Sequence, residues 1–235
     1  MKKLIAILLA LVLVLAMTAC GSEETATPAA EEAAPAATEE AATPAEEAAP
    51  AAAEESLEVS DATPVVNAYG TFDKSLISGG VLLTSVGQSA DGATMETLLK
   101  KSGVEYTANF TATDADLDGI GVLIVATGAS TKGLGNAGIS IEDETSRSEA
   151  LLKACDEKGI TVIMCHIGGS ARRGGTSDQF IQLVMEHSAY MIVVADGNTY
   201  DGSFSISDYC KDNSVPLTLV KSMSNVLTPL GEIFG

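Results

Sequence analysis

Six short runs rich in Val, Ile and Leu constrain the fold of this chain more than any other feature. Each run is separated from the next by a connection, in most cases long enough for a helix, and a strand buried on both faces of a parallel sheet has this nearly continuous apolar character. The pattern therefore predicts an α/β fold. The expected strands are residues 81–86, 105–110, 122–127, 161–166, 190–195 and 217–220, and the expected helices are 93–101, 142–158, 177–187, 205–211 and 224–233.

The connections indicate how the sheet is wound. Parallel neighbours need a crossover of about a dozen residues or more, usually right-handed, so we expect a mainly parallel sheet in a three-layer sandwich. A flavodoxin-like strand order, 2-1-3-4-5 with the sixth strand at the edge, is favoured, and the Rossmann-like order 3-2-1-4-5-6 remains an alternative. Residues 80–235 are expected to form one domain, which 59–79 extend by a short strand or an irregular segment.

The start of the chain has the organisation of an export signal. Lys2 and Lys3 precede an uncharged apolar run at 4–17, and Thr18, Ala19 and Cys20 follow directly. This junction resembles the lipobox of bacterial lipoproteins, which implies removal of the signal peptide 1–19 and a palmitate-type lipid on Cys20. The apolar run is shorter than the roughly 20 residues that a spanning helix needs. An ordinary secretory signal and an uncleaved anchor are the alternatives.

Residues 20–58 are predicted to be a disordered linker. Between Gly21 and Glu58 the chain has eleven acids and no Lys or Arg, and Pro28, Pro35, Pro44 and Pro50 recur in an Ala- and Glu-rich background. Such a segment buries too little apolar surface to offset its ordering entropy, and proline interrupts helix. We therefore expect a tether that holds the domain away from the membrane.

The net charge excludes one class of partner. Of a formal charge of -19, the part beyond Glu58 retains 21 acids against 11 bases, a net charge near -10. Phosphate backbones would be repelled at long range, so we expect no nucleic-acid partner.

A ligand site is expected at the carboxyl ends of the first, third and fourth expected strands, because α/β sheets bind ligands there. The loops that follow these strands carry glycines, hydroxyls and three bases, which would form a positive well for a carboxylate, phosphate or sulfate in an otherwise negative domain. The third loop also resembles a generic anion nest, although it lacks the spacing of a Walker loop or a dinucleotide fingerprint. The alternative is that Arg172 and Arg173 are solvated or paired with the acids at 142–144. The candidate residues are Gln88, Ser89, Ser130, Thr131, Lys132, Gly133, His166, Gly168, Gly169, Arg172 and Arg173.

His166 is the candidate for acid–base chemistry, since it ends an apolar strand beside this rim. A structural, hydrogen-bonded role is the alternative. The acids at 142–144 are interpreted as helix-capping residues, with metal binding the weaker option. Cys155, Cys165 and Cys210 show no metal-ligand spacing, so we expect no metal and no cofactor, with buried thiols or one disulfide both open.

Three stretches, LLTSVGQS at 82–89, GASTKGLG at 128–135 and HIGGSARRG at 166–174, resemble an uncharacterised family of exported bacterial α/β domains that covers about 80–235. The resemblance implies one domain and no activity. We expect a lipid-anchored, extracytoplasmic module on the outer or periplasmic side of a membrane that binds a small anionic ligand. An extracytoplasmic hydrolase that uses His166 and an accessory subunit of a membrane complex, with an unknown protein partner, are the alternatives.

Overall fold

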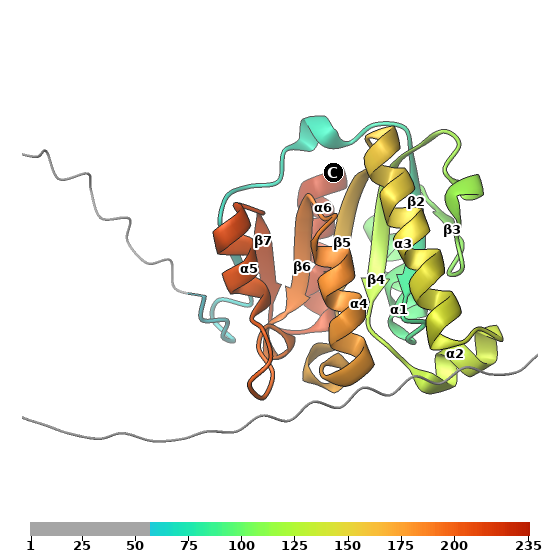
Figure 1. The fold of residues 1–235 in the computed structure, drawn as a ribbon. Coiled ribbons are helices and arrows are strands. Elements are labelled where there is room, and N and C mark those ends of the chain that lie inside the picture. The colour runs from blue at the N-terminus through green and yellow to red at the C-terminus, as the bar shows by residue number, and fades with distance from the viewer. Residues whose placement is uncertain (1–56) are drawn as a thin grey trace, which may run out of the picture. The chain divides into compact units, whose positions relative to one another are not determined.

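A seven-stranded sheet runs through residues 57–235, the part of the chain that the computed structural model describes (Figure 1). The strand order is β1-β7-β6-β5-β4-β2-β3, and β1 is antiparallel to β7 while every other pair is parallel. The predicted α/β class with a mainly parallel sheet is confirmed. The strands are β1 Val65–Ala68, β2 Gly80–Val86, β3 Thr107–Ala108, β4 Ile120–Thr127, β5 Thr161–His166, β6 Tyr190–Val194 and β7 Leu217–Val220.

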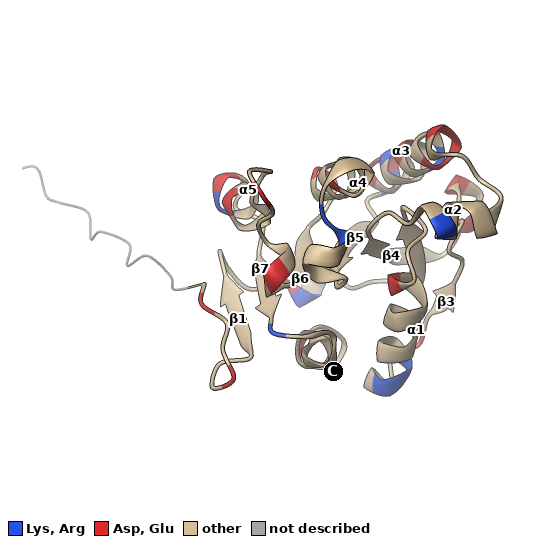
Figure 2. Cartoon of the chain, turned by 90° about the horizontal axis from the view of Figure 1, so that it is seen from below, with Lys and Arg blue, Asp and Glu red and all other residues tan. Residues whose placement is uncertain are grey.

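Helices cover both faces of the sheet, which gives the expected three layers (Figures 1 and 2). Helices α3, α4 and α5 lie on one face, and α1 and α6 lie on the other. The short helix α2 lies at the edge where β4 ends. The helices are α1 Asp91–Ser102, α2 Thr131–Ala137, α3 Ile141–Lys158, α4 Gly175–Met185, α5 Ile206–Asn213 and α6 Leu227–Phe234.

The alternation of side chains along β4 explains why its sequence is apolar throughout. Leu123 and Val125 pack in the core under α3, α4 and α5, whereas Ile124 and Ala126 pack in the core under α1 and α6. All four are fully buried. Successive strand residues point to opposite faces, so a strand between two helical layers has no exposed face on which to place polar residues.

Two elements differ from the expectation. Strand β3 spans only Thr107–Ala108, at the outer edge, where both residues are exposed and no further strand of residues 57–235 extends the sheet. The glycine-rich loop after β4 contains the helix α2, which the sequence analysis did not predict. Ser130 caps this helix by accepting a hydrogen bond from the Gly133 amide, and Gly138 ends it in the left-handed conformation. A side-chain cap and a C-terminal glycine thus stabilise a helix despite its low intrinsic propensity.

The extension before β2 adds a strand to the sheet. Strand β1 pairs with β7, and the segment that follows it runs across to β2 (Figure 1). On the way, the Leu76 carbonyl accepts a hydrogen bond of 2.9 Å from the Thr161 hydroxyl at the start of β5. The extension is therefore attached to the sheet where the parallel strands begin, on the side away from their carboxyl ends.

The predicted signal peptide, Cys20 and nearly all of the predicted tether lie outside the described residues. Within residues 57–235, no helix has the length and apolar character needed to cross a membrane. The three cysteines of this part, Cys155, Cys165 and Cys210, are buried free thiols, which answers the question of a disulfide between them.

Candidate functional site

The loops after β2, β4 and β5 meet at the carboxyl edge of the sheet, the edge that Figure 2 shows from below. The Ser130 amide donates to the Gly87 carbonyl at 2.9 Å, which joins the first two loops. The Ala129 amide donates to the Ser177 hydroxyl of α4 at 2.9 Å, which joins the second loop to the segment after β5. Segments far apart in the sequence therefore share one rim.

Asp91 occupies the centre of this rim. It is the first residue of α1, directly after the loop of β2, and only 4% of its surface is exposed. Its Oδ2 atom is buried and has no hydrogen-bond partner among residues 57–235. The nearest cation is Arg172, whose Nε lies 3.8 Å from Oδ2, beyond hydrogen-bond distance. A buried carboxylate oxygen without a partner is costly, so its presence requires an explanation.

Glycine at position 168 permits this arrangement. A Cβ atom there would lie 2.1 Å from Arg172 Cγ and 2.5 Å from Asp91 Oδ2. Any larger residue at position 168 would displace the Arg172 side chain or the Asp91 carboxylate, because its Cβ would clash with both. Arg172 remains accessible, with 32% of its side chain exposed. Its guanidinium is therefore the cation of the rim that a ligand can reach beside Asp91.

His166 lies beneath the rim and does not reach solvent. The residue is fully buried, and its Nδ1 is 3.1 Å from the Thr127 carbonyl oxygen, so Nδ1 donates and Nε2 is left as an acceptor. Nε2 has no hydrogen-bond partner in the described part of the chain. Burial lowers the pKa of His166, and this outweighs the opposing effect of the bond to Thr127. The imidazole is thus neutral at physiological pH.

Arg173 belongs to the framework rather than to the open rim. Its side chain is fully buried, and Nε donates to Asp178 Oδ1 at 2.7 Å. The remaining nitrogens donate to the carbonyls of Gly197, Asn198 and Phe204, and the Phe204 ring lies 4.5 Å from the guanidinium carbon. The bonds to the three carbonyls hold the segment after β6, the bond to Asp178 holds α4, and Arg173 has no exposed donor for a ligand. It is paired with an acid, but with Asp178 rather than with those at 142–144.

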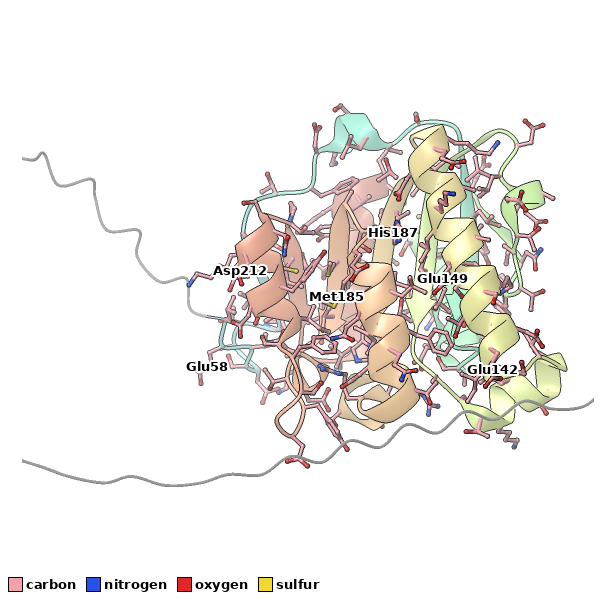
Figure 3. All side chains as sticks on the ribbon, in the orientation of Figure 1. Glu58, Glu142, Glu149, Met185, His187 and Asp212 are labelled. Carbon is pink, nitrogen blue, oxygen red and sulfur yellow. The ribbon has the colours of Figure 1, made fainter. Side chains whose placement is uncertain are left out.

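Gln88 also has a structural role. Its amide nitrogen donates to the Phe110 carbonyl at 2.7 Å and to Glu144 Oε1 at 3.1 Å. Glu144 is fully buried, although Glu142 and Glu149 on the same helix are exposed (Figure 3). Arg147 donates to both Glu144 oxygens, at 2.8 and 2.9 Å. This ion pair fixes the loop after β2. The interpretation of the acids at 142–144 as capping residues is confirmed for Asp143, which forms a capping box with Ser140, whereas the Glu144 carboxylate binds Arg147 and Gln88.

The loop after β4 contributes side chains rather than backbone amides. The amides of Gly128, Ala129, Ser130 and Gly133 all donate to acceptors within the protein, so these four amides are not available to an anion. Thr131 and Lys132 are exposed at the start of α2. In Figure 2 the basic segment of α2 and the basic segment that enters α4 lie apart.

Of the predicted residues, the structure thus brings together Ser89, Gly168 and Arg172, with Gly169 beginning the turn that carries Arg172. Ser89 accepts a hydrogen bond from the Asp91 amide at 3.2 Å. The sequence analysis missed Asp91. The sequence did indicate it, because Asp91 is an acid that follows Gln88 and Ser89 in the loop between a predicted strand and the next helix.

Comparison with known proteins identifies the family to which the domain is similar. A family model described as a domain of unknown function, DUF6305, matches residues 78–234. No curated protein matches the chain. The match begins near β2 and leaves β1 and the segment before it outside the shared domain.

Proposed function

This chain belongs to the DUF6305 family of domains of unknown function, and we propose from its own geometry that the domain binds a small anion that also carries a hydrogen-bond donor. The observation that carries the proposal is the buried Asp91 Oδ2, which has no hydrogen-bond partner among residues 57–235 and lies 3.8 Å from Nε of the accessible Arg172. A ligand hydroxyl or ammonium group would donate to Asp91, and the adjoining carboxylate or phosphate would accept from Arg172.

The pair of charges selects for such a ligand. An anion alone would be repelled by the Asp91 carboxylate next to its arginine, and a simple cation would be repelled by Arg172. A ligand with both groups converts each repulsion into a charge-assisted hydrogen bond. Lys132 at the start of α2 adds a second, more distant positive charge that attracts the anion.

Binding is favoured over hydrolysis. His166 has no exposed surface, whereas Asp91 and Arg172 keep some exposed surface at the rim, and a general acid or base must come within hydrogen-bond reach of the proton it transfers. The imidazole instead supports the Thr127 carbonyl from below.

The site is tested by calorimetric titration of the purified protein with small carboxylates and phosphates that carry a neighbouring hydroxyl. We expect binding that Arg172→Ala weakens at least about tenfold, because a charge-assisted bond is lost. Lys101→Ala removes an exposed charge at the far end of α1 and serves as the control. No binding by any member of the panel, or equal affinity in Arg172→Ala, would contradict the proposal.

We further propose that Cys20 carries the lipid that places this domain outside the cytoplasm. The support is the sequence at the lipobox and the acidic segment that follows it. Cells that express the chain and are fed labelled palmitate should incorporate label into the wild-type protein and not into Cys20→Ala. Equal labelling of both proteins would refute lipidation at this residue.

A further inference from the structure

A cavity lies on the side of the sheet away from the rim, between the β1–β7 edge and α6. Its volume is about 190 Å³. A dry cavity of about 150 Å³ can hold benzene, so this one has room for a slightly larger molecule. It is lined by Asn67, Gly70, Thr71, Phe72, Lys74, Tyr190, Thr218, Glu232 and Ile233.

A directed chain of hydrogen bonds crosses the wall of the cavity. The Thr218 hydroxyl donates to Asn67 Oδ1 at 2.5 Å, because that oxygen can only accept. The Tyr190 hydroxyl must therefore donate to Thr218. Burial raises the pKa of Tyr190 to about 12, so it keeps the proton that it donates. At one end of this chain of hydrogen bonds, Tyr190 Oη can still accept a hydrogen bond. At the other end, the side-chain amide of Asn67 has two protons that no described residue accepts.

The remaining walls combine an apolar surface with two opposite charges. The rings of Phe72 and Tyr190 are tilted against each other with centroids 5.1 Å apart, and Ile233 lies beside them. Glu232 comes from α6, and Lys74 comes from the short 3-10 helix Lys74–Leu76, where its ammonium also donates to the Gly235 carbonyl at 3.5 Å. The cavity thus offers one carboxylate and one ammonium group beside an aromatic wall.

We propose that this cavity binds a free amino acid. The ligand ammonium group pairs with Glu232 and the Tyr190 oxygen, and the ligand carboxylate pairs with Lys74 and the Asn67 amide. The aromatic wall and Ile233 contact a small apolar side chain, which the volume limits to a few carbon atoms. A molecule that carries only one of the two charges would leave Glu232 or Lys74 without its counterpart.

The cavity is a feature of this chain rather than of the matched family domain alone. Five of its nine lining residues precede position 78, where the family match begins. Strand β1 carries Asn67 directly opposite Thr218 of β7, and directly opposite residues of a strand pair share a face. The extension therefore completes a pocket that β6, β7 and α6 would leave open.

The proposal is tested by calorimetric titration of the purified full-length protein with each proteinogenic amino acid. We expect at least one small apolar amino acid to bind, and both Glu232→Gln and Lys74→Ala to weaken that binding about tenfold or more. The matched controls are Glu186→Gln and Lys211→Ala, which change exposed charges directly after α4 and on α5. Amidation of the bound amino acid should reduce its affinity to the same extent as Lys74→Ala.

Three outcomes would overturn the proposal. The first is no binding by any amino acid, and the second is binding that neither cavity variant weakens. The third is binding that Arg172→Ala abolishes while the cavity variants bind normally, since the amino acid would then occupy the rim. Because the two sites respond to different variants, failure of one proposal is distinguishable from failure of the other.

Discussion

The guanidinium of Arg173 lies directly against the carboxylate of Asp178, with Nε 2.7 Å from Oδ1, and the pair holds three carbonyls of the segment after β6. This contact gives Arg173 a different role from its neighbour Arg172. Arg173 is buried and satisfied, whereas Arg172 is partly exposed and lies near Asp91 without a hydrogen bond. Arg173 therefore has a stabilising role, and the proposed ligand contact falls to Arg172 alone.

We expect Arg173→Gln to lower the free energy of unfolding by about 3 to 5 kcal/mol, because removing one partner leaves a buried charge uncompensated. Amide hydrogen exchange should increase at residues 197–204, the segment that Arg173 holds. Urea unfolding measures the first effect. Arg172→Ala is the control, and its effect should be about 1 kcal/mol or less, as for a partly exposed ion pair. Equal destabilisation by both substitutions would contradict these roles.

Glu144 is expected to be the most sensitive acid of α3. Its oxygens accept from Arg147, Gln88 and the Gly87 amide, and no part of the residue is exposed. Glu144→Ala should cost about 3 to 5 kcal/mol in urea unfolding, since Arg147 would lose its counter-charge in the interior. Glu149→Ala on the exposed side of the same helix should change stability little. A tolerated Glu144→Ala would disprove the importance of this buried pair.

His166 should make stability depend on pH. Burial lowers its pKa in the folded state, so below the ordinary histidine value of about 6.5 the unfolded chain takes up the proton first. The neutral imidazole contributes fully to the free energy of unfolding above that pH, and this contribution declines as the pH falls below it. His166→Gln should remove this part of the slope. Unfolding free energies of both proteins measured across this range should converge toward acid pH, and parallel curves would rule out the effect.

The thiols of residues 57–235 should be unreactive in the native protein. Burial raises the pKa of Cys155, Cys165 and Cys210 to about 12, so the reactive thiolate is scarce at neutral pH. A chromogenic disulfide reagent should label them only after denaturation, which is the control for their presence. Rapid labelling of any of the three without unfolding would show that it is more accessible than the structure indicates.

Periodicity was sufficient to predict the α/β class and most strands, because a strand such as β5 is apolar at nearly every position. It was insufficient for α2, where a Ser cap and a terminal Gly stabilise a helix within a glycine-rich sequence. The meeting of the loops after β2, β4 and β5 was predictable, since the carboxyl ends of parallel strands lie at the same edge of a sheet. The roles of single residues were not predictable, because whether Arg172 or Arg173 is buried depends on the turn between them and on distant Asp178 and Phe204.

The central claim is that the free oxygen of Asp91 accepts a hydrogen bond from the ligand. The most direct test compares lactate with propionate, which differ only by the hydroxyl, in binding to wild-type protein and to Asp91→Asn. We expect wild-type protein to prefer lactate by about tenfold or more, and Asp91→Asn to lose most of that preference. Equal affinity of the two anions for wild-type protein, or an unchanged preference in Asp91→Asn, would contradict the account.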